Sequence, residues 1–134
     1  MSKAALEVIS KSMKELGINY QFKRWKGHPQ YPYFVGSYQE VPTLGEDGMK
    51  ETSFILTGFA RSDGTVDGVV VLEEAKEKIE SCFNTVGGKV VSTDSGSVVA
   101  IFYENAFGNL PTGDAELEKI EINLTIKEWS VKKV

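Results

Sequence analysis

Apolar residues near the beginning of the chain recur with the spacing of an amphipathic helix. They are separated by steps of three, four and three positions, so they share one helical stripe. The members of this stripe are Leu6, Ile9, Met13 and Leu16. Ser2 precedes the pattern and Gly17 follows it, at positions where helices commonly begin and end. The pattern therefore predicts a first helix that opens near Ser2 and ends at Gly17.

Three segments with strand character follow this helix. Residues 18–25 alternate between apolar and polar positions, as a half-buried strand does. Residues 31–41 and 51–61 are rich in aromatic and β-branched residues, and Pro32 is acceptable at a strand start or on an edge. The intervening residues 42–50 contain turn-forming prolines and glycines. The last two segments therefore predict a long hairpin.

A second helix is predicted over residues 71–86. Its apolar stripe consists of Leu72, Ala75, Ile79 and Phe83. Glu73 and Glu77 lie four residues apart among lysines, which indicates a solvated face. The preceding segment SDGTVDG, residues 62–68, contains two aspartates but lacks the later bidentate glutamate of a calcium loop. It therefore favours a surface turn.

The remaining segments again have strand character. Residues 89–94 and 98–107 have the apolar density of strands in a covered sheet, and residues 108–114 form a loop. Residues 117–130 alternate over an unusual length, with Ile120, Ile122, Leu124 and Ile126 on one side. We favour a central position for this last strand. At an edge it would either pair with another copy of the chain in a ring or carry charged residues that prevent such pairing.

The order of elements predicts an α+β fold, with a mainly antiparallel sheet and two helices packed on one face. The 134 residues are 41% hydrophobic and 25% charged, which is typical of a globular chain, and no internal repeat is present. At this length one hydrophobic core is sufficient. We therefore expect a single domain that spans residues 1–134.

Charge and cysteine content exclude several classes of function. The net charge is −4 and the basic residues are dispersed among carboxylates, which argues against a protein that grips nucleic-acid phosphates. No window approaches the ~20 apolar residues needed to cross a bilayer. A single cysteine is typical of a reducing compartment. We expect an intracellular protein with no specific nucleic-acid binding and no membrane association.

Candidate catalytic side chains are few. His28 is the sole histidine and lies between Gly27 and Pro29, which indicates a loop position. Cys82 falls next to Phe83 in the second helix and is interpreted as a small buried hydrophobe. Neither has a partner at the spacing of a catalytic pair or a metal site. We therefore expect no enzymatic activity, no metal and no cofactor.

The stretch HPQYPYFVGSY, residues 28–38, concentrates aromatic side chains. These are Tyr31, Tyr33, Phe34 and Tyr38. A platform that stacks nucleic-acid bases would come with a positive groove, whereas Gln39 and Glu40 follow here. Tyrosine is also enriched where one protein covers another, because its ring is apolar and its hydroxyl forms hydrogen bonds. The stretch therefore favours an architectural or protein-contact role.

Several segments resemble tail terminator (tail-completion) proteins of long-tailed bacteriophages and prophages. The resemblance spans nearly the whole chain and rests on strand layout and local sequence, with no catalytic signature. The segments are KELGINYQFKRW (14–25), QYPYFVGSYQE (30–40), EDGMKETSFILTGFAR (46–61), LEEAKEKIESCF (72–83), IFYENAF (101–107) and PTGDAELEKIEINLTIKEW (111–129).

The resemblance implies a structural, minor tail protein of virion assembly. Such a subunit forms a ring, hexameric in the virion, and a monomer in isolation is compatible with this. The ring caps the head-proximal end of the tail tube, ends tube polymerisation and provides the surface that docks to the head. The implied partners are further copies of the chain, the tail tube protein and a head-completion (neck) protein. The implied location is the bacterial host cytoplasm during assembly and then the virion tail.

By the same analogy, two loops are candidates for subunit or tail-tube contacts. The candidate residues are Leu44, Glu46, Asp47 and Met49 in the hairpin loop, and Phe107, Asn109 and Leu110 in the later loop. Two alternatives stay open. One is a head-closure or head-tail joining (neck) protein, which has a similar size and layout. The other is a small ligand- or peptide-binding α+β domain whose pocket is lined by the aromatic strand.

Overall fold

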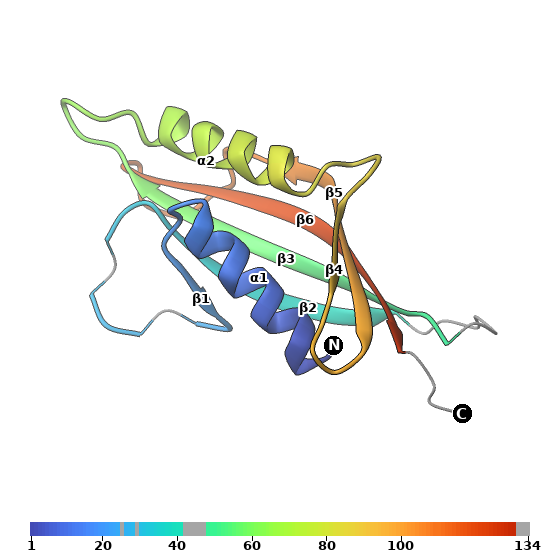
Figure 1. The fold of residues 1–134 in the computed structure, drawn as a ribbon. Helices are drawn as coiled ribbons and strands as arrows, with labels where there is room; N and C mark the ends of the chain where they lie inside the picture. The colour runs from blue at the N-terminus through green and yellow to red at the C-terminus, as the bar shows by residue number, and fades with distance from the viewer. Residues whose placement is uncertain (25, 29, 42–47, 131–134) are drawn as a thin grey trace.

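The computed structural model describes residues 1–24, 26–28, 30–41 and 48–130. The element order is helix, three strands, helix, three strands, as the sequence predicts (Figure 1). The bounds are α1 Lys3–Glu15, β1 Tyr20–Phe22, β2 Tyr33–Val41, β3 Lys50–Arg61, α2 Gly68–Cys82, β4 Lys89–Ser92, β5 Ser97–Phe107 and β6 Leu117–Ser130.

The strands form one six-stranded sheet in the order β1-β2-β3-β6-β5-β4. All neighbouring pairs are antiparallel except β1 with β2, which is parallel. The β3–β6 register runs from Lys50 opposite Glu128 to Arg61 opposite Leu117. The final strand therefore lies in the interior of the sheet, so the favoured central position of residues 117–130 is confirmed and the edge alternative is wrong.

Both helices cover the same face of the sheet (Figure 1). Every second residue of β3 and β6 points towards them and is buried, because side chains alternate between the two faces of a strand. The centre of this core is formed by Ile9, Met13, Phe54, Leu56, Ile79, Phe83, Ile122 and Leu124. The predicted α+β class, with two helices on one face of a mainly antiparallel sheet, is confirmed.

The helices begin at side chains that cap their free N–H groups. Ser2 Oγ accepts a hydrogen bond from the Ala5 N–H at 3.1 Å, and Gly17 follows α1 with a φ of +71°. Asp67 caps α2 by accepting from the Val69 N–H at 3.0 Å. The second helix therefore spans residues 68–82 instead of the predicted 71–86.

The segment before α2 is a tight turn, as predicted. Asp63 Oδ1 accepts from the N–H groups of Thr65 and Val66 at 2.7 and 2.8 Å, and from the Thr65 hydroxyl at 2.9 Å. These three donors lower the pKa of the Asp63 carboxyl, with the Thr65 N–H as the largest cause. The aspartates of this segment therefore organise a turn and a helix cap.

The first strand is shorter than predicted. Its ladder with β2 covers Tyr20 to Phe22 only, and Lys23 adopts a φ of 75°, which turns the chain out of the extended conformation. The Lys23 N–H still donates to the Gly36 carbonyl at 2.7 Å. The alternation over residues 18–25 identified a strand but could not reveal this turn.

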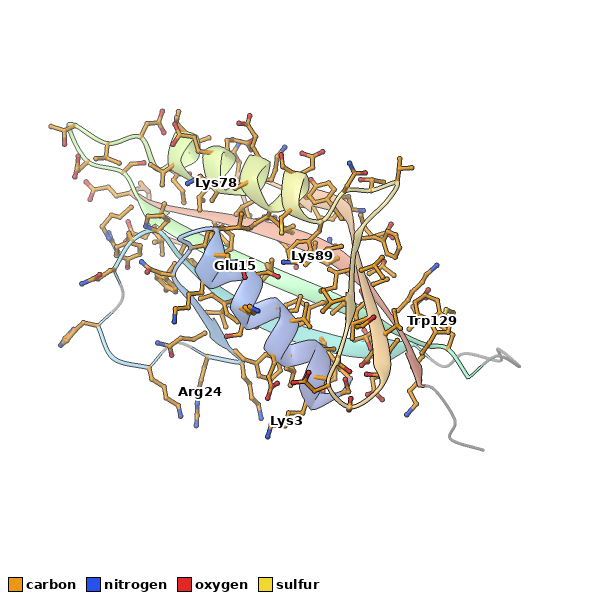
Figure 2. The ribbon with its side chains drawn as sticks, in the orientation of Figure 1. Lys3, Glu15, Arg24, Lys78, Lys89 and Trp129 are labelled. Carbon is orange, nitrogen blue, oxygen red and sulfur yellow. The ribbon has the colours of Figure 1, made fainter. Side chains whose placement is uncertain are left out.

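Strand β4 is tied to α1 by a lysine. Lys89 Nζ donates to Ser12 Oγ at 2.8 Å and lies 3.7 Å from Glu15 Oε2 (Figure 2). Ser12 is buried although it is polar, so this hydrogen bond satisfies its hydroxyl. The contact holds α1 against the far edge of the sheet.

Candidate assembly surfaces

No helix or strand of the described chain covers the face of the sheet opposite the helices (Figure 1). The outward residues of β6 are nevertheless only partly exposed, because neighbouring side chains shield one another. Asn123 Nδ2 donates to Asn105 Oδ1 at 2.8 Å, and the Thr125 hydroxyl donates to Glu104 Oε1 at 2.6 Å. We call this surface the open face, and its middle is polar.

One end of the open face carries an aromatic cluster. The rings of Tyr31 and Tyr33 have centroids 5.4 Å apart, and the ring of Tyr33 lies 5.1 Å from that of Phe59. The Arg61 guanidinium lies 5.5 Å from the Tyr31 centroid, and Lys119 Nζ lies 5.9 Å from that of Phe59. The cluster therefore joins three aromatic rings to Arg61 and Lys119. Aromatic and arginine side chains are enriched at protein interfaces.

Arg61 is held in place by two neighbours. Hydrogen bonding with Tyr31 and then with Asp114 raises the pKa of the guanidinium, and Arg61 Nη1 lies 3.1 Å from Asp114 Oδ2. The Glu116 N–H and Arg61 lower the pKa of the Asp114 carboxyl. This pairing links β3 to the β5–β6 loop, so the aromatic cluster rests on a defined scaffold.

The aromatic residues of the stretch 28–38 separate onto two faces. Tyr31 and Tyr33 lie in the cluster, whereas Phe34 is fully buried beneath the helices. Tyr38 lies on the helix side at the β1–β2 edge, where its ring stacks on Phe22 at 5.9 Å. These two rings are 40% and 37% exposed, so they form a second apolar surface. The stretch is architectural in its centre and exposed at both ends.

The loop residues proposed as contacts belong to two separate segments of the chain. Leu44, Glu46 and Asp47 fall outside the described residues. Met49 directly precedes β3 and is partly buried.

Phe107, Asn109 and Leu110 surround the end of β5. Phe107 is 52% exposed, and Asn109 adopts a φ of 54°. The Leu110 N–H donates to the Lys119 carbonyl at 3.2 Å, which fastens the loop to the start of β6.

Met49 and Phe107 lie far apart. Met49 precedes Lys50, which pairs with Glu128, while Phe107 pairs with Glu121 at the other end of β6. Seven strand residues separate these registers, or roughly 23 Å at the usual rise per residue. The described candidates Met49 and Phe107 therefore lie towards opposite ends of the sheet.

A hollow of about 410 Å³ lies beside the start of α1. Its lining is polar and comes from Met1, Ser2, Glu40, Lys50, Ser95, Ser97 and Glu128. Glu128 is only 7% exposed and accepts from the Ser2 N–H at 3.3 Å and from the Ser2 hydroxyl. The aromatic strand contributes none of its tyrosines to this hollow, so the hollow does not match an aromatic ligand pocket.

The most reactive side chains, His28 and Cys82, lie in separate parts of the fold. His28 is exposed in the β1–β2 connection, and Cys82 is partly buried at the end of α2. Burial raises the pKa of the Cys82 thiol, which lowers its nucleophilic fraction. Within the described ranges no three His, Cys, Asp or Glu side chains gather at metal-binding distance, and no helix there is long and apolar enough to span a membrane.

Sequence reasoning missed much of the aromatic cluster. It identified the tyrosines but not Phe59, Arg61 and Lys119, which lie on other strands. Phe59 falls on the opposite side of β3 from Phe54 and Leu56, so an apolar residue out of phase with the core was the available signal.

No protein-family model matches the chain, and no curated protein matches its sequence.

Proposed function

We propose that the chain is a phage or prophage tail terminator, a non-enzymatic subunit that forms a ring on the head-proximal end of the tail tube. In this role it ends tube polymerisation and offers the surface to which the head docks. The partners are further copies of the chain, the tail tube protein and a head-completion protein. The resemblance of the sequence segments supplies these identities.

The observation that carries the proposal is the one-sided sheet. Both helices lie on one face, while the open face presents the aromatic cluster of Tyr31, Tyr33 and Phe59 beside two cations (Figure 1). Aromatic and arginine side chains dominate the binding energy of protein interfaces. A subunit whose work is assembly needs such surfaces, and an enzyme would instead need convergent reactive groups.

The distribution of the candidate loops also supports the proposal. Met49 and Phe107 lie at opposite ends of the sheet, so one end is free to contact the tube while the other faces the head or a neighbouring subunit. A ring placed between two larger assemblies requires two such separate surfaces.

The direct test uses tail tubes assembled from the tube protein of the same phage genome. The purified chain is added during and after polymerisation, and tube lengths and ends are imaged by electron microscopy. We expect tubes of uniform length with added density at one end. Tubes that grow without limit and carry bare ends would contradict the proposal, whereas binding only to already terminated tails would indicate a neck protein.

A matched pair of variants locates the contact. Phe107→Ser removes an exposed ring from a candidate loop, and Val86→Ser removes an exposed apolar side chain from the turn after α2. We expect Phe107→Ser to reduce the fraction of capped tubes and Val86→Ser to leave it unchanged. Equal effects of both variants would remove the β5–β6 loop from the contact.

A further inference from the structure

Two exposed surfaces of the chain have opposite charge. The β1 end of the sheet carries a basic rim, which we define as Lys3, Lys23, Arg24 and Lys26. The exposed side of α2 carries an acidic stripe, which we define as Val70, Glu74 and Glu77. In sequence terms, residues 1–41 hold six cations and three carboxylates, and residues 62–82 hold six carboxylates and two lysines.

The basic rim adjoins a pair of apolar rings. The exposed rings of Phe22 and Tyr38 stack directly beside Lys23, at the edge where β1 ends. The ion pairs found among the described residues do not involve Lys23, Arg24 or Lys26. An apolar patch with free cations around it is suited to a partner that is acidic and partly apolar.

The acidic stripe combines one apolar residue with two carboxylates, and Lys78 lines the same hollow as both carboxylates. Positions 70, 74 and 77 follow the i, i+4, i+7 spacing of one helix face. Val70 is 50% exposed and provides an apolar contact, while Glu74 and Glu77 are exposed and take part in no ion pair within the described chain. Nearby, Glu73 is already paired with Lys76 at 3.4 Å.

The two surfaces lie on different sides of the fold. The rim lies at the β1 edge of the sheet, while α2 packs over β3, β6 and β5. Figure 2 places the side chains of Lys3 and Arg24 on the side of the molecule away from α2. Contact between them therefore requires a second copy, and a contact between two different patches repeats from copy to copy.

We propose that the basic rim of one copy binds the acidic stripe of the next, in a head-to-tail contact between identical chains. Phe22 and Tyr38 pack on Val70, and Lys23 and Arg24 face Glu74 and Glu77. This inference rests on the proposed function, because it names the subunit contact of the ring. It specifies which surfaces meet, and the charge complementarity of the chain selects another copy as the occupant.

Zero-length crosslinking tests the location of the contact. A mixture of ¹⁵N-labelled and unlabelled protein at high concentration and low ionic strength is treated with a carbodiimide, which joins lysine amines to carboxylates in contact. We expect peptides of mixed labelling that join Lys23 or Lys26 to Glu74 or Glu77. Mixed peptides that join only other surfaces, or none, would overturn the proposal.

Reversing the charges on each surface tests how much they contribute to the affinity between copies. Lys23→Glu with Arg24→Glu reverses the rim, and Glu74→Lys with Glu77→Lys reverses the stripe. Each double variant is expected to lower the association constant from sedimentation by about tenfold, because like charges then face each other. An equimolar mixture of the two variants, or one chain with all four changes, restores opposite charges and is expected to recover association.

The matched control is Lys11→Glu with Lys14→Glu, which changes the net charge as much as the rim variant does but at exposed positions along α1. We expect it to associate like the wild type. A loss as large as that of the rim variant, or failure of the fourfold exchange to recover association, would overturn the contact.

The contact between copies and the proposed capping of tail tubes can be tested independently. Tubes capped equally well by the rim variant, with no recovery on charge exchange, would refute this contact and leave the proposed function in place. If the rim charges affect only binding to the tube, the occupant is the tube protein and the contact between copies is wrong. Recovery by charge exchange without any affinity for tubes would keep the contact and remove the proposed function.

Discussion

Gly58 is the position where the sheet is least tolerant of a larger side chain. It lies opposite Phe34 in the β2–β3 ladder, and the Phe34 ring covers it on the helix side. A Cβ at residue 58 would lie 2.3, 2.6 and 2.9 Å from three ring atoms of Phe34, whereas ordinary contact begins at 3.4 Å. The Gly58→Ala variant therefore forces the ring to move by about 1 Å, or the two strands to separate.

The magnitude follows from two opposing effects. Alanine restricts the unfolded chain more than glycine does, which stabilises a protein by about 0.4–1 kcal/mol where the backbone permits it. Gly58 lacks a left-handed φ, so this gain applies. Overpacking of a close-packed core costs about 1–3 kcal/mol. Phe34 is fully buried and has no exposed space to move into, so we expect a net loss of about 1–2 kcal/mol.

Urea denaturation followed by circular dichroism measures the free energy of unfolding. The control is Gly87→Ala, at a position where a Cβ would meet no atom within 4 Å and φ is not left-handed. We expect this control to be neutral or slightly stabilising. A loss for Gly58→Ala below about 0.5 kcal/mol, which is the range of ordinary surface changes, would refute the packing argument.

A double-variant cycle assigns the loss to the ring. Phe34→Leu alone removes buried volume and destabilises the protein, but in combination with Gly58→Ala the smaller side chain leaves room for the added methyl group. The two losses should then fall short of additivity by about 1 kcal/mol. Strict additivity would mean that the effect of Gly58→Ala arises elsewhere.

Three further predictions concern single side chains. Ser2→Ala removes the cap on the Ala5 N–H and a donor to the buried Glu128 carboxylate, so we expect a loss of about 1–3 kcal/mol in urea denaturation, and an unchanged midpoint would contradict this. The pKa of the Asp63 carboxyl is lowered in the folded state. The stability that this carboxylate contributes is therefore present above its unfolded pKa of about 4 and is lost as pH falls through its folded pKa. Asp63→Ala should be less stable than the wild type at pH 7 in urea denaturation, and the difference in unfolding free energy should shrink towards pH 3. Burial raises the pKa of the Cys82 thiol, so iodoacetamide should alkylate the folded chain more slowly than the urea-unfolded chain, and equal rates by mass spectrometry would oppose this.

The fold could be predicted from the sequence because the long strands have a strict period of two. In β6 the four residues Ile120, Ile122, Leu124 and Ile126 all face the helices, and a shift by one position would expose all of them. The apolar stripes of both helices likewise recur with the helical period of 3.6 residues. Patterns of this length determine element type and buried face without any knowledge of the partner strand.

The order and edges of the sheet could not be predicted in this way. The parallel pairing of β1 depends on only three residues and on the turn at Lys23, whose φ of 75° has no signal in the apolar pattern. The interior position of β6 also depends on pairing between segments more than 50 residues apart, such as Arg61 opposite Leu117. Local periodicity carries no information about such pairing.

The candidate surfaces were predicted in part for the same reason. Tyr31 and Tyr33 stood out because aromatic residues cluster in the sequence, but their neighbours Phe59 and Lys119 come from other strands. The order of the strands in the sheet decides which residues become neighbours on one surface. The sequence could therefore indicate an exposed aromatic region but not the cations beside it.

Sheet architecture limits how copies of this chain can associate. The two longest strands, β3 and β6, are paired on both sides, so neither offers a free row of backbone groups. The outermost strands are short, with three residues paired in β1 and four in β4. Short edge strands restrict pairing with another chain, and each backbone hydrogen bond contributes only about 1 kcal/mol net. In the contact proposed between copies, affinity must then come mainly from side chains. Because the two proposed surfaces are charged, this association should weaken as ionic strength rises.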